Sequence, residues 1–585
     1  MTRVWSWAAT FLAVIGLALA APAAAQDAPD IAGVWHGAIA TPQGGLTLVL
    51  HVSRGEDGAI VAKIENYDQN PGNPADVTEI SVTGSRLSWR VAPISATYEG
   101  DWDEASQQWR GTFNQGGDLP LDFAKGAPPP KPVVEGLDGV WVGIIERNGA
   151  RLRQVLSVRT IDQGTFATYS SPDQMLNGAP VSDLVRQGPT VGLTAFNGFL
   201  TFAGTLSDDG TELAGTWSQP NQPDMAITFT RASEEAIAAR RNPARPQTPK
   251  EPFPYKVEEV AFDNPDFAGV RLAGTLTLPG GEGPFSAAIM ITGSGGQDRD
   301  ETLLDHKPFA VIADHLTRNG IAVLRFDDRG VGQSTGNYAA ATSADLATDA
   351  NAAFAYLASR PEIRRDAIGM IGHSEGGMIG PIAMAGNADV AYLVSLAGPG
   401  TDLIQLMLSQ RRLLTSQMGL SQEEIDRQEP IMRALFEALA AADTPEAGFD
   451  AALAVLTPEA KEALGLPPGT DGAVVVRQIS GPWFQYFLNY DPVPFWSRIE
   501  VPVLALNGSL DLQVPPENLA AIRAAMAGHP DLTVVELEGL NHLFQTATTG
   551  SVGEYRDIEE TFSPRALELM SDWINVRFGS ESQPR

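Results

Sequence analysis

The sequence predicts an α/β domain, with a mostly parallel sheet and helices on both faces, in the C-terminal part of a 585-residue chain. Residues 367–371 form a short apolar run of the kind that is buried as a parallel strand, and 287–291 and 501–507 have the same character. Residues 377–385 are small and apolar enough to form a helix packed on such a sheet. Strands that alternate with helices in this way are typical of a parallel sheet covered on both faces.

A serine lies at the predicted turn between the central strand and its helix. Residues 372–376 read Gly-His-Ser-Glu-Gly, so glycines flank Ser374 on both sides. Such glycines permit the sharp strand-to-helix turn on which a nucleophilic serine stands exposed above the sheet. The pattern Gly-x-Ser-x-Gly also recurs by chance, but its place between a strand and a helix predicts that Ser374 is a nucleophile.

The nucleophile needs an acid and a base, which come later in the chain, acid first, in folds with this turn. Asp511 follows the last of the three apolar runs, and His542 follows a further predicted strand, 532–537. Residues just past the carboxyl ends of parallel strands lie at the edge where open α/β sheets bind ligands. We therefore predict that Ser374, His542 and Asp511 form a catalytic triad. Asp491, in a predicted insertion, is the nearest alternative acid.

His542 is the one histidine among the seven in the chain that fits as the general base. It follows the predicted nucleophile and lies after a late strand; its alternative role is that of a capping or surface residue. The other six histidines lack this context. His36 and His51 lie in the N-terminal region, and His306 and His315 precede the serine. His373 stands beside the serine, and His529 lies in a loop between a predicted helix and strand.

Acyl transfer also requires hydrogen-bond donors for the oxyanion that develops on the substrate. One donor is expected to be the backbone N–H of Glu375, the residue after the nucleophile. The other is expected in the glycine-rich loop after strand 287–291, where we predict the N–H of Ser294, with Gly295 as second choice. A plain glycine-rich turn is the alternative. The glycine spacing differs from that of a dinucleotide-binding loop, so we predict no nucleotide cofactor.

Four segments extend this pattern: 291–301 (Ile-Thr-Gly-Ser-Gly-Gly-Gln-Asp-Arg-Asp-Glu), 326–334 (Phe-Asp-Asp-Arg-Gly-Val-Gly-Gln-Ser), 372–377 and 540–542 (Leu-Asn-His). Together they resemble the bacterial EstD-type esterases, in the serine-aminopeptidase-like branch of the α/β-hydrolases. The resemblance covers about residues 250–577. The Asp-Arg-Gly-x-Gly-x-Ser segment is common to many α/β-hydrolases, whereas His-Ser-Glu-Gly-Gly and Gly-Gln-Asp-Arg-Asp are more particular.

The resemblance implies an α/β-hydrolase fold and a carboxylic-ester hydrolase with catalytic Ser374, Asp511 and His542. We expect Asp327, Asp328 and Arg329 to be structural residues that pin the loop after strand 321–326 by ion pairing.

The N-terminus predicts a signal peptide over residues 1–25, with Arg3 before an apolar run and Ala-Ala-Ala before the cleavage site at Gln26. An uncleaved membrane anchor is the alternative. Cleavage would give an extracytoplasmic protein, periplasmic or secreted, without cysteines and therefore without disulfides. A net charge of −31 disfavours nucleic acids and anionic membranes as partners. The oligomeric state is not predictable from these features.

Two copies of a small all-β domain are predicted ahead of the catalytic domain, at residues 31–125 and 137–231. Gly-Val-Trp-x-Gly at 33–37 recurs at 139–143, and alternating apolar residues predict strands that form small barrels or sandwiches. Proline-rich segments at 127–132 and 242–254 are expected to act as linkers. The domains are expected to pack against the catalytic domain. The alternative is that Trp35 and Trp141 bind a ligand or glycan, but tryptophans on the strands of small barrels are more often core residues.

Within the catalytic domain, 255–577, the stretch 401–495 is far longer than a connection between two strands needs. Its apolar residues recur at helical spacing, and Ser421 with Glu424 predicts a capping box at the start of a helix. We expect this insertion to form a helical lid over the nucleophile, or else to pack on the sheet.

The expected function is that of a serine carboxylic-ester hydrolase that acts on small to medium esters through an acyl-enzyme. A serine aminopeptidase would need a carboxylate for the substrate's α-ammonium group, for which Asp298, Asp300 and Glu301 are the candidates. The second alternative is a ligand- or glycan-binding protein with an inert hydrolase domain. The positions of histidines and carboxylates show no zinc-ligand spacing, so no metal is expected.

Overall fold

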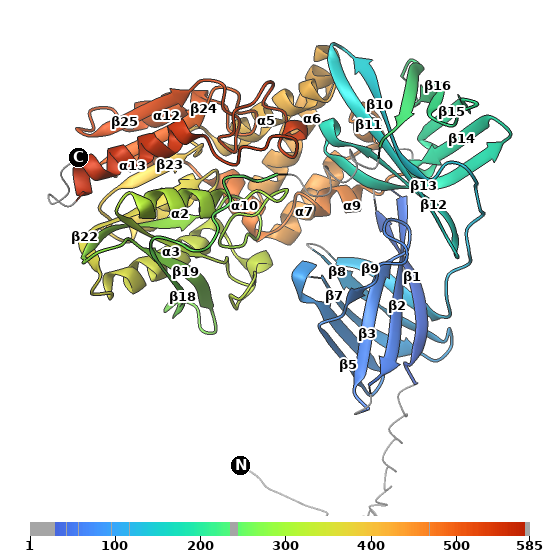
Figure 1. Ribbon diagram of the computed structural model, residues 1–585, viewed down its shortest axis with the longest axis horizontal. Coiled ribbons are helices and arrows are strands. Elements are labelled where there is room, and N and C mark those ends of the chain that lie inside the picture. Colours follow the sequence, from blue (N-terminus) through green and yellow to red (C-terminus); the bar gives the residue numbers. More distant parts are fainter. Residues whose placement is uncertain are drawn as a thin grey trace, which may run out of the picture.

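The computed structural model describes residues 30–579 apart from 42–43, 56–57, 95, 116–117, 221, 234–243 and 467–468. The predicted signal peptide and its cleavage site therefore lie outside the described residues. Figure 1 shows two β units and one α/β unit, with a group of helices between the α/β sheet and the second β unit.

The α/β unit is built on an eight-stranded sheet in the order β18-β19-β21-β20-β22-β23-β24-β25. The neighbours from β21 to β25 pair in parallel, and β19 is antiparallel to both β18 and β21. The prediction of a mostly parallel sheet is confirmed. The strands are β18 (Lys256–Asp263), β19 (Arg271–Leu278), β20 (Phe285–Ile291), β21 (Ile321–Phe326), β22 (Ile363–His373), β23 (Leu393–Leu396), β24 (Val503–Gly508) and β25 (Leu532–Leu537).

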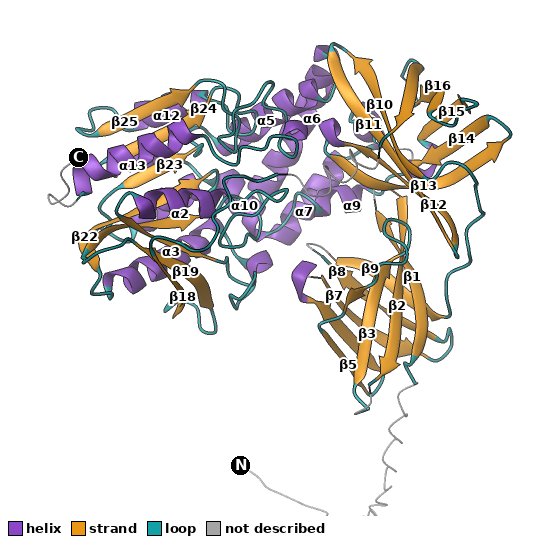
Figure 2. Ribbon diagram, in the orientation of Figure 1, coloured by secondary structure: helices purple, strands orange, loops and turns teal. Residues whose placement is uncertain are grey.

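Helices cover both faces of this sheet, as Figure 2 shows. Successive side chains of a strand point to opposite faces, so each strand supplies two cores. Leu504 and Leu506 of β24 pack with α2 (Pro308–Arg318) and α13 (Pro564–Phe578), whereas Val503 and Ala505 pack with α3 (Ser343–Ala358), α4 (Gly376–Ala385) and α12 (Glu517–Ala525).

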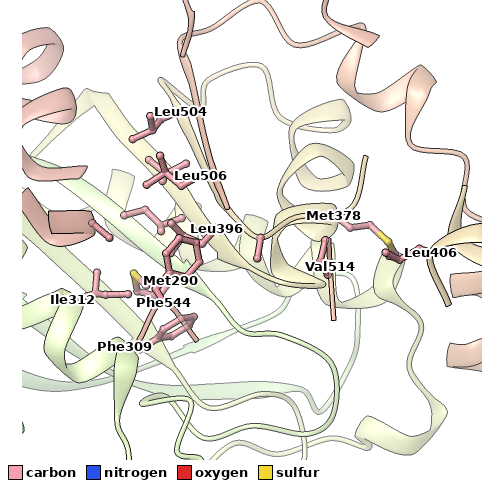
Figure 3. Packing of buried hydrophobic residues seen from close by; sticks show 14 of the residues in the cluster. Met290, Phe309, Ile312, Met378, Leu396, Leu406, Leu504, Leu506, Val514 and Phe544 are labelled. Atoms are coloured by element: carbon pink, nitrogen blue, oxygen red, sulfur yellow. The ribbon is translucent and has the colours of Figure 1, made fainter. Parts of the chain in front are cut away.

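The first core reaches the edge of the sheet that carries the predicted site. Met290 and Leu396, from the ends of β20 and β23, lie close to Phe309 of α2 and to Phe544, two residues after His542 (Figure 3). Phe544 is fully buried. Hydrophobic packing therefore anchors the loop that carries His542 to the sheet.

The first β unit is a nine-stranded sheet in the order β4-β3-β2-β1-β9-β8-β7-β6-β5, and in the second unit β10 to β17 form a closed barrel. The first nine strands are Gly33–Thr41, Gly44–Arg54, Ile60–Asn66, Ala75–Asp76, Glu79–Thr83, Arg86–Val91, Ala96–Asp103, Gln108–Asn114 and Asp118–Lys125. Strands β10 to β17 are Gly139–Arg147, Ala150–Ile161, Gly164–Ser171, Leu176–Gln187, Thr190–Ala195, Leu200–Leu206, Glu212–Ser218 and Met225–Arg231.

Trp35 and Trp141 occupy equivalent places in the two β units. Each side chain is at most 1% exposed. Each indole N–H donates to the carbonyl oxygen four residues earlier, over 2.7 and 2.8 Å respectively. Both side chains are therefore core residues, and neither forms the surface that ligand binding through these tryptophans would need.

The described residues between β23 and β24 form seven helices: α5 (Leu403–Gln417), α6 (Gln422–Ala440), α7 (Pro445–Val455), α8 (Pro458–Ala463), α9 (Gly472–Arg477), α10 (Pro482–Asn489) and α11 (Val493–Trp496). Residues 467–468 between α8 and α9 are outside the described part. The capping box of Ser421 and Glu424 is confirmed at the start of α6. Leu403, Leu406 and Leu408 are the buried side chains of α5.

The second β unit contacts the turn between α5 and α6. The amide of Asn148 donates to the carbonyl oxygen of Gly419 over 2.7 Å, and the amide of Gln174 donates to that of Met418 over 3.0 Å. Arg147 forms an ion pair with Glu424 at 2.8 Å. The barrel thus holds the tip of the helical insertion at three points.

No helix among the described residues is long and apolar enough to span a membrane.

Candidate active site

Ser374 lies in the turn between β22 and α4. Its φ angle is +53°, in the left-handed region that a non-glycine residue rarely adopts, and its side chain is half-buried. The chain must turn tightly here: a Cβ added to Gly372 would lie 2.0 Å from the carbonyl oxygen of Gly376. A Cβ on Gly376 would lie 2.1 Å from the carbonyl oxygen of Ile291. Steric constraint explains both glycines, and it produces the strained turn that a nucleophilic serine requires.

Asp511 and His542 are brought together at the same edge of the sheet, from the loops after β24 and β25. Nδ1 of His542 lies 2.8 Å from Oδ2 of Asp511. The other oxygen of Asp511 accepts the backbone N–H groups of Gln513 and Val514, over 2.8 and 2.9 Å. Both residues are less than 5% exposed. Because Asp511 holds Nδ1, the Nε2 atom is the one left to accept a proton.

The loop of His542 is attached to the turn that carries Ser374. Nε2 of His373, the residue before the serine, lies 2.9 Å from the carbonyl oxygen of His542, and the two rings are 4.8 Å apart. Within the described residues no hydrogen bond joins the Ser374 hydroxyl to His542. The structure therefore shows the acid–base pair, and shows its loop fixed beside the serine; the catalytic roles stay predictions.

The two predicted oxyanion donors are free to bind an oxyanion. Neither the N–H of Ser294 nor that of Glu375 donates a hydrogen bond within the described part of the chain. Ser294 is exposed, and its neighbour Gly293 lies against Ser374: a Cβ added to Gly293 would be 3.3 Å from Cβ of the serine. The N–H of Gly293 itself is occupied, because it donates to Oε1 of Glu301 over 2.8 Å.

Buried polar contacts hold the loop after β21 as expected, although only two of the three residues form ion pairs. Asp327 pairs with Arg299 at 2.8 Å, and Arg329 pairs with Asp349 at 2.7 Å. Asp328 instead accepts hydrogen bonds from the Thr292 hydroxyl and the Gln297 N–H, both over 2.8 Å. Burial raises the pKa of Asp328 well above its usual range. Asp328 thus ties this loop to the loop of Ser294.

The Glu375 side chain contacts the helical insertion, which the sequence did not predict. Its Oε1 accepts the Ser343 hydroxyl over 2.6 Å and the indole N–H of Trp483, in α10, over 2.8 Å. Its other oxygen is buried without a partner in the described structure. Burial raises the pKa of this carboxyl group, which favours the neutral, protonated form.

All three carboxylates that could serve an α-ammonium group are engaged by the protein. Asp298 accepts the backbone N–H groups of Asp300 and Thr302, each over 3.0 Å. Asp300 pairs with Arg325 and Lys307. Oε1 of Glu301 accepts hydrogen bonds from Nδ1 of His373 and from the N–H of Gly293. Asp300 and Glu301 are thus paired with cationic or histidine side chains, whereas in the described structure Asp298 is held only by backbone N–H groups at Oδ1.

In the described part of the chain, no group of three or more histidine, cysteine or acidic side chains is arranged to hold a metal ion.

Comparison with known proteins gives two informative matches. Residues 306–421 match a family model described as "Serine aminopeptidase, S33". Esterase EstD of Thermotoga maritima is 27% identical over 292 residues, which is 50% of this chain and 62% of that protein. The chain therefore spans less than two thirds of the length of this relative.

Two solved structures were also found to be similar. The α/β hydrolase GrgF from Penicillium sp. sh18 is 19% identical, with 56% of this chain and 100% of that chain covered and a TM-score of 0.35. The Pyrococcus furiosus esterase Pf2001 is 14% identical, with 56% and 92% covered and a TM-score of 0.34. Both scores are below 0.5, so these two likenesses carry no weight in the assignment.

The resemblance to EstD-type esterases that the motifs indicated is confirmed by these two matches. Over half of its length the chain is a homologue of Esterase EstD, and its α/β unit contains a match to the serine aminopeptidase S33 family of α/β-hydrolases.

Proposed function

We propose that this protein is a serine carboxylic-ester hydrolase. The observation that carries the proposal is the buried pair of Asp511 and His542, together with the hydrogen bond between His373, the residue before Ser374, and the carbonyl oxygen of His542. A buried carboxylate that holds Nδ1 of a histidine leaves Nε2 to activate a serine hydroxyl. An inert domain would have no need of this arrangement.

The proposed reaction proceeds through an acyl-enzyme. His542 accepts the proton of the Ser374 hydroxyl while the serine oxygen attacks the ester carbonyl, and the N–H groups of Ser294 and Glu375 bind the oxyanion. The imidazolium then returns its proton to the departing alcohol. A water molecule, deprotonated by His542, attacks the acyl group and releases the carboxylic acid, and the proton from His542 restores the serine hydroxyl.

The substrate is proposed to be an ester with a small to medium apolar acyl group. Trp483, Phe484 and Phe487 of α10 form a cluster of stacked and tilted rings, and Trp483 is bonded to the residue after the nucleophile. These contacts support a lid formed by residues 401–495, with an apolar inner surface beside the serine.

The catalytic domain is proposed to span 255–577. The contacts of Arg147, Asn148 and Gln174 with the turn between α5 and α6 support a packing role for the β domain at 137–231, and the same role is proposed for the β domain at 31–125.

Aminopeptidase activity is the weaker alternative, because Asp298, Asp300 and Glu301 are all engaged in contacts with the protein. Export is proposed on the basis of the predicted signal peptide alone. The proposed partner is a small-molecule ester, and no nucleic acid is proposed as a partner.

One comparison of substrates tests the proposal. Purified protein would be assayed with p-nitrophenyl esters of graded chain length and with aminoacyl-p-nitroanilides. Ser374→Ala serves as the blank and Ser359→Ala, an exposed serine at the end of α3, as the matched control. We expect ester turnover in the wild type and in Ser359→Ala, and none above background in Ser374→Ala. Faster turnover of the anilides would favour the peptidase, and no turnover of either would favour the binding protein.

A further inference from the structure

A second buried pair of an acid and a histidine lies beside the predicted triad. Oε1 of Glu301 is 3.0 Å from Nδ1 of His373, and Nε2 of the same ring is 2.9 Å from the carbonyl oxygen of His542. Glu301 is 4% exposed and His373 is 6% exposed. Neither residue has a part in the reaction proposed above.

The partners of His373 determine its protonation state. A carbonyl oxygen can only accept a hydrogen bond, so Nε2 must carry a proton. The carboxylate of Glu301 is also an acceptor, so Nδ1 must carry one as well. His373 is therefore an imidazolium that forms an ion pair with Glu301. Burial acts to lower the pKa of His373, but the charge and hydrogen bond of Glu301 outweigh it and raise that pKa above its usual value, with a smaller contribution from Asp511.

This pair joins three segments that are distant in the sequence. Glu301 accepts the N–H of Gly293, in the loop that carries the oxyanion donor Ser294. His373 precedes the nucleophile, and it donates to the backbone of the residue proposed as the base. The charged groups around the imidazolium are Glu301 and Asp511, with His542 beside it.

The backbone of Glu301 is held in an unfavourable conformation, which fits a functional constraint. Its φ angle is +52°, in the left-handed region, although the residue is neither glycine nor asparagine. Such strain persists only where surrounding contacts fix it, and it is concentrated at functional sites. Here the backbone N–H of Glu301 donates to the carbonyl oxygen of Asp298 over 2.9 Å, and the side chain is held by Gly293 and His373.

Resting on the function proposed above, we propose that Glu301 and His373 are positioning residues for ester hydrolysis. Their ion pair sets the oxyanion loop and the loop of His542 at fixed distances from the Ser374 turn. An acyl-transfer site needs all three within a fraction of an ångström, since a misplacement of about 1 Å can cost about 10²-fold in rate.

The test uses the full chain and separates positioning from stability. We expect His373→Phe and Glu301→Ala to lower kcat about 10²-fold with KM changed less than about threefold, measured on folded protein well below its melting midpoint. Glu301→Gln keeps the volume of the side chain but removes the negative charge that pairs with the imidazolium, so its kcat should fall as well. His315→Phe is the matched control, because His315 is a half-buried histidine of α2 bonded to Ser571, and its kcat should not change.

A second measurement begins with the wild-type protein, where the result does not depend on whether any variant folds. In wild-type protein labelled with ¹⁵N-histidine, both ring nitrogens of His373 should be protonated at neutral pH, and Glu301→Gln should convert the ring to a single neutral tautomer. Variants that are less stable but keep wild-type kcat would overturn the proposal, as would a neutral His373 in the wild type. If Ser374→Ala still hydrolysed esters, the proposed function would fail instead, which is a separate result.

Discussion

The indole N–H of Trp483 donates a hydrogen bond to the Glu375 carboxyl group, although the two residues are 108 positions apart in the chain. Glu375 is the residue after Ser374, and Trp483 belongs to the helical insertion. One contact therefore joins the proposed lid to the turn that carries the proposed nucleophile. The carboxyl group that makes this contact with α10 is buried, and burial raises its pKa.

Trp483→Phe removes this hydrogen bond while keeping most of the aromatic contact with Phe484 and Phe487. A hydrogen bond of this kind contributes about 1 kcal/mol, so we expect KM for esters to rise about fivefold and kcat to change less. Trp573→Phe is the control, because Trp573 of α13 donates to Thr533 instead. Equal KM values for the two variants would argue against a lid held by Trp483.

Glu375→Gln should stabilise the protein, and more so as the pH rises. The folded state raises the pKa of Glu375, so it binds the proton more tightly than the unfolded chain does. The stability that this provides is complete below the ordinary carboxyl pKa and is lost as the pH rises toward the folded pKa. Glutamine cannot ionise and loses nothing.

Thermal unfolding at pH values of about 4 and about 8 checks this expectation, since the ordinary pKa of a glutamate is about 4.3. The melting midpoint of Glu375→Gln should exceed that of the wild type at the higher pH and approach it at the lower one. A difference that is independent of pH would mean that burial of the carboxyl group is not its cause.

Gly372→Ala and Gly376→Ala should each disrupt the Ser374 turn, because the added methyl group would lie within 2.1 Å of a carbonyl oxygen. Clashes of this kind cost about 1–3 kcal/mol or more, and here they also displace the proposed nucleophile. Gly386→Ala, at the other end of α4, meets no atom closer than 3.7 Å and serves as the control. The melting midpoint and kcat are measured for all three variants. Wild-type values of both in Gly372→Ala or in Gly376→Ala would refute this account of the turn.

Asp511→Asn should lower kcat about 10⁴-fold, because the amide no longer holds the histidine in the tautomer that accepts the serine proton. Asp491→Asn tests the alternative acid and should leave kcat unchanged, since Asp491 is exposed and its side chain accepts the N–H of Val493. The opposite ranking of the two variants would transfer the role of the acid to Asp491.

The sequence was sufficient to predict the sheet and the order of the candidate triad. Local apolar runs determine β20, β22 and β24, and chain order places the loops of Asp511 and His542 at the carboxyl edge that carries Ser374. The side chain of Phe544 packs in the core and so anchors the end of the loop that carries His542.

The polar contacts behind the site could not be predicted from the sequence. Glu301 reaches His373 across 72 positions, and Trp483 reaches Glu375 across 108. No local periodicity reports such pairs, because they depend on how separate elements pack. The aromatic residues of the insertion were a visible signal for Trp483, but His373 and Glu301 carried none beyond their place in two motifs.

The most direct test of the central claim is to identify the residue that a fluorophosphonate modifies. This reagent mimics the tetrahedral intermediate and stays bound to an activated serine. Peptide mass spectrometry should locate one adduct on Ser374, with loss of ester turnover in proportion to labelling, and Ser374→Ala should remain unmodified. An adduct on another serine, or full turnover by the labelled enzyme, would contradict the assignment of Ser374 as the nucleophile.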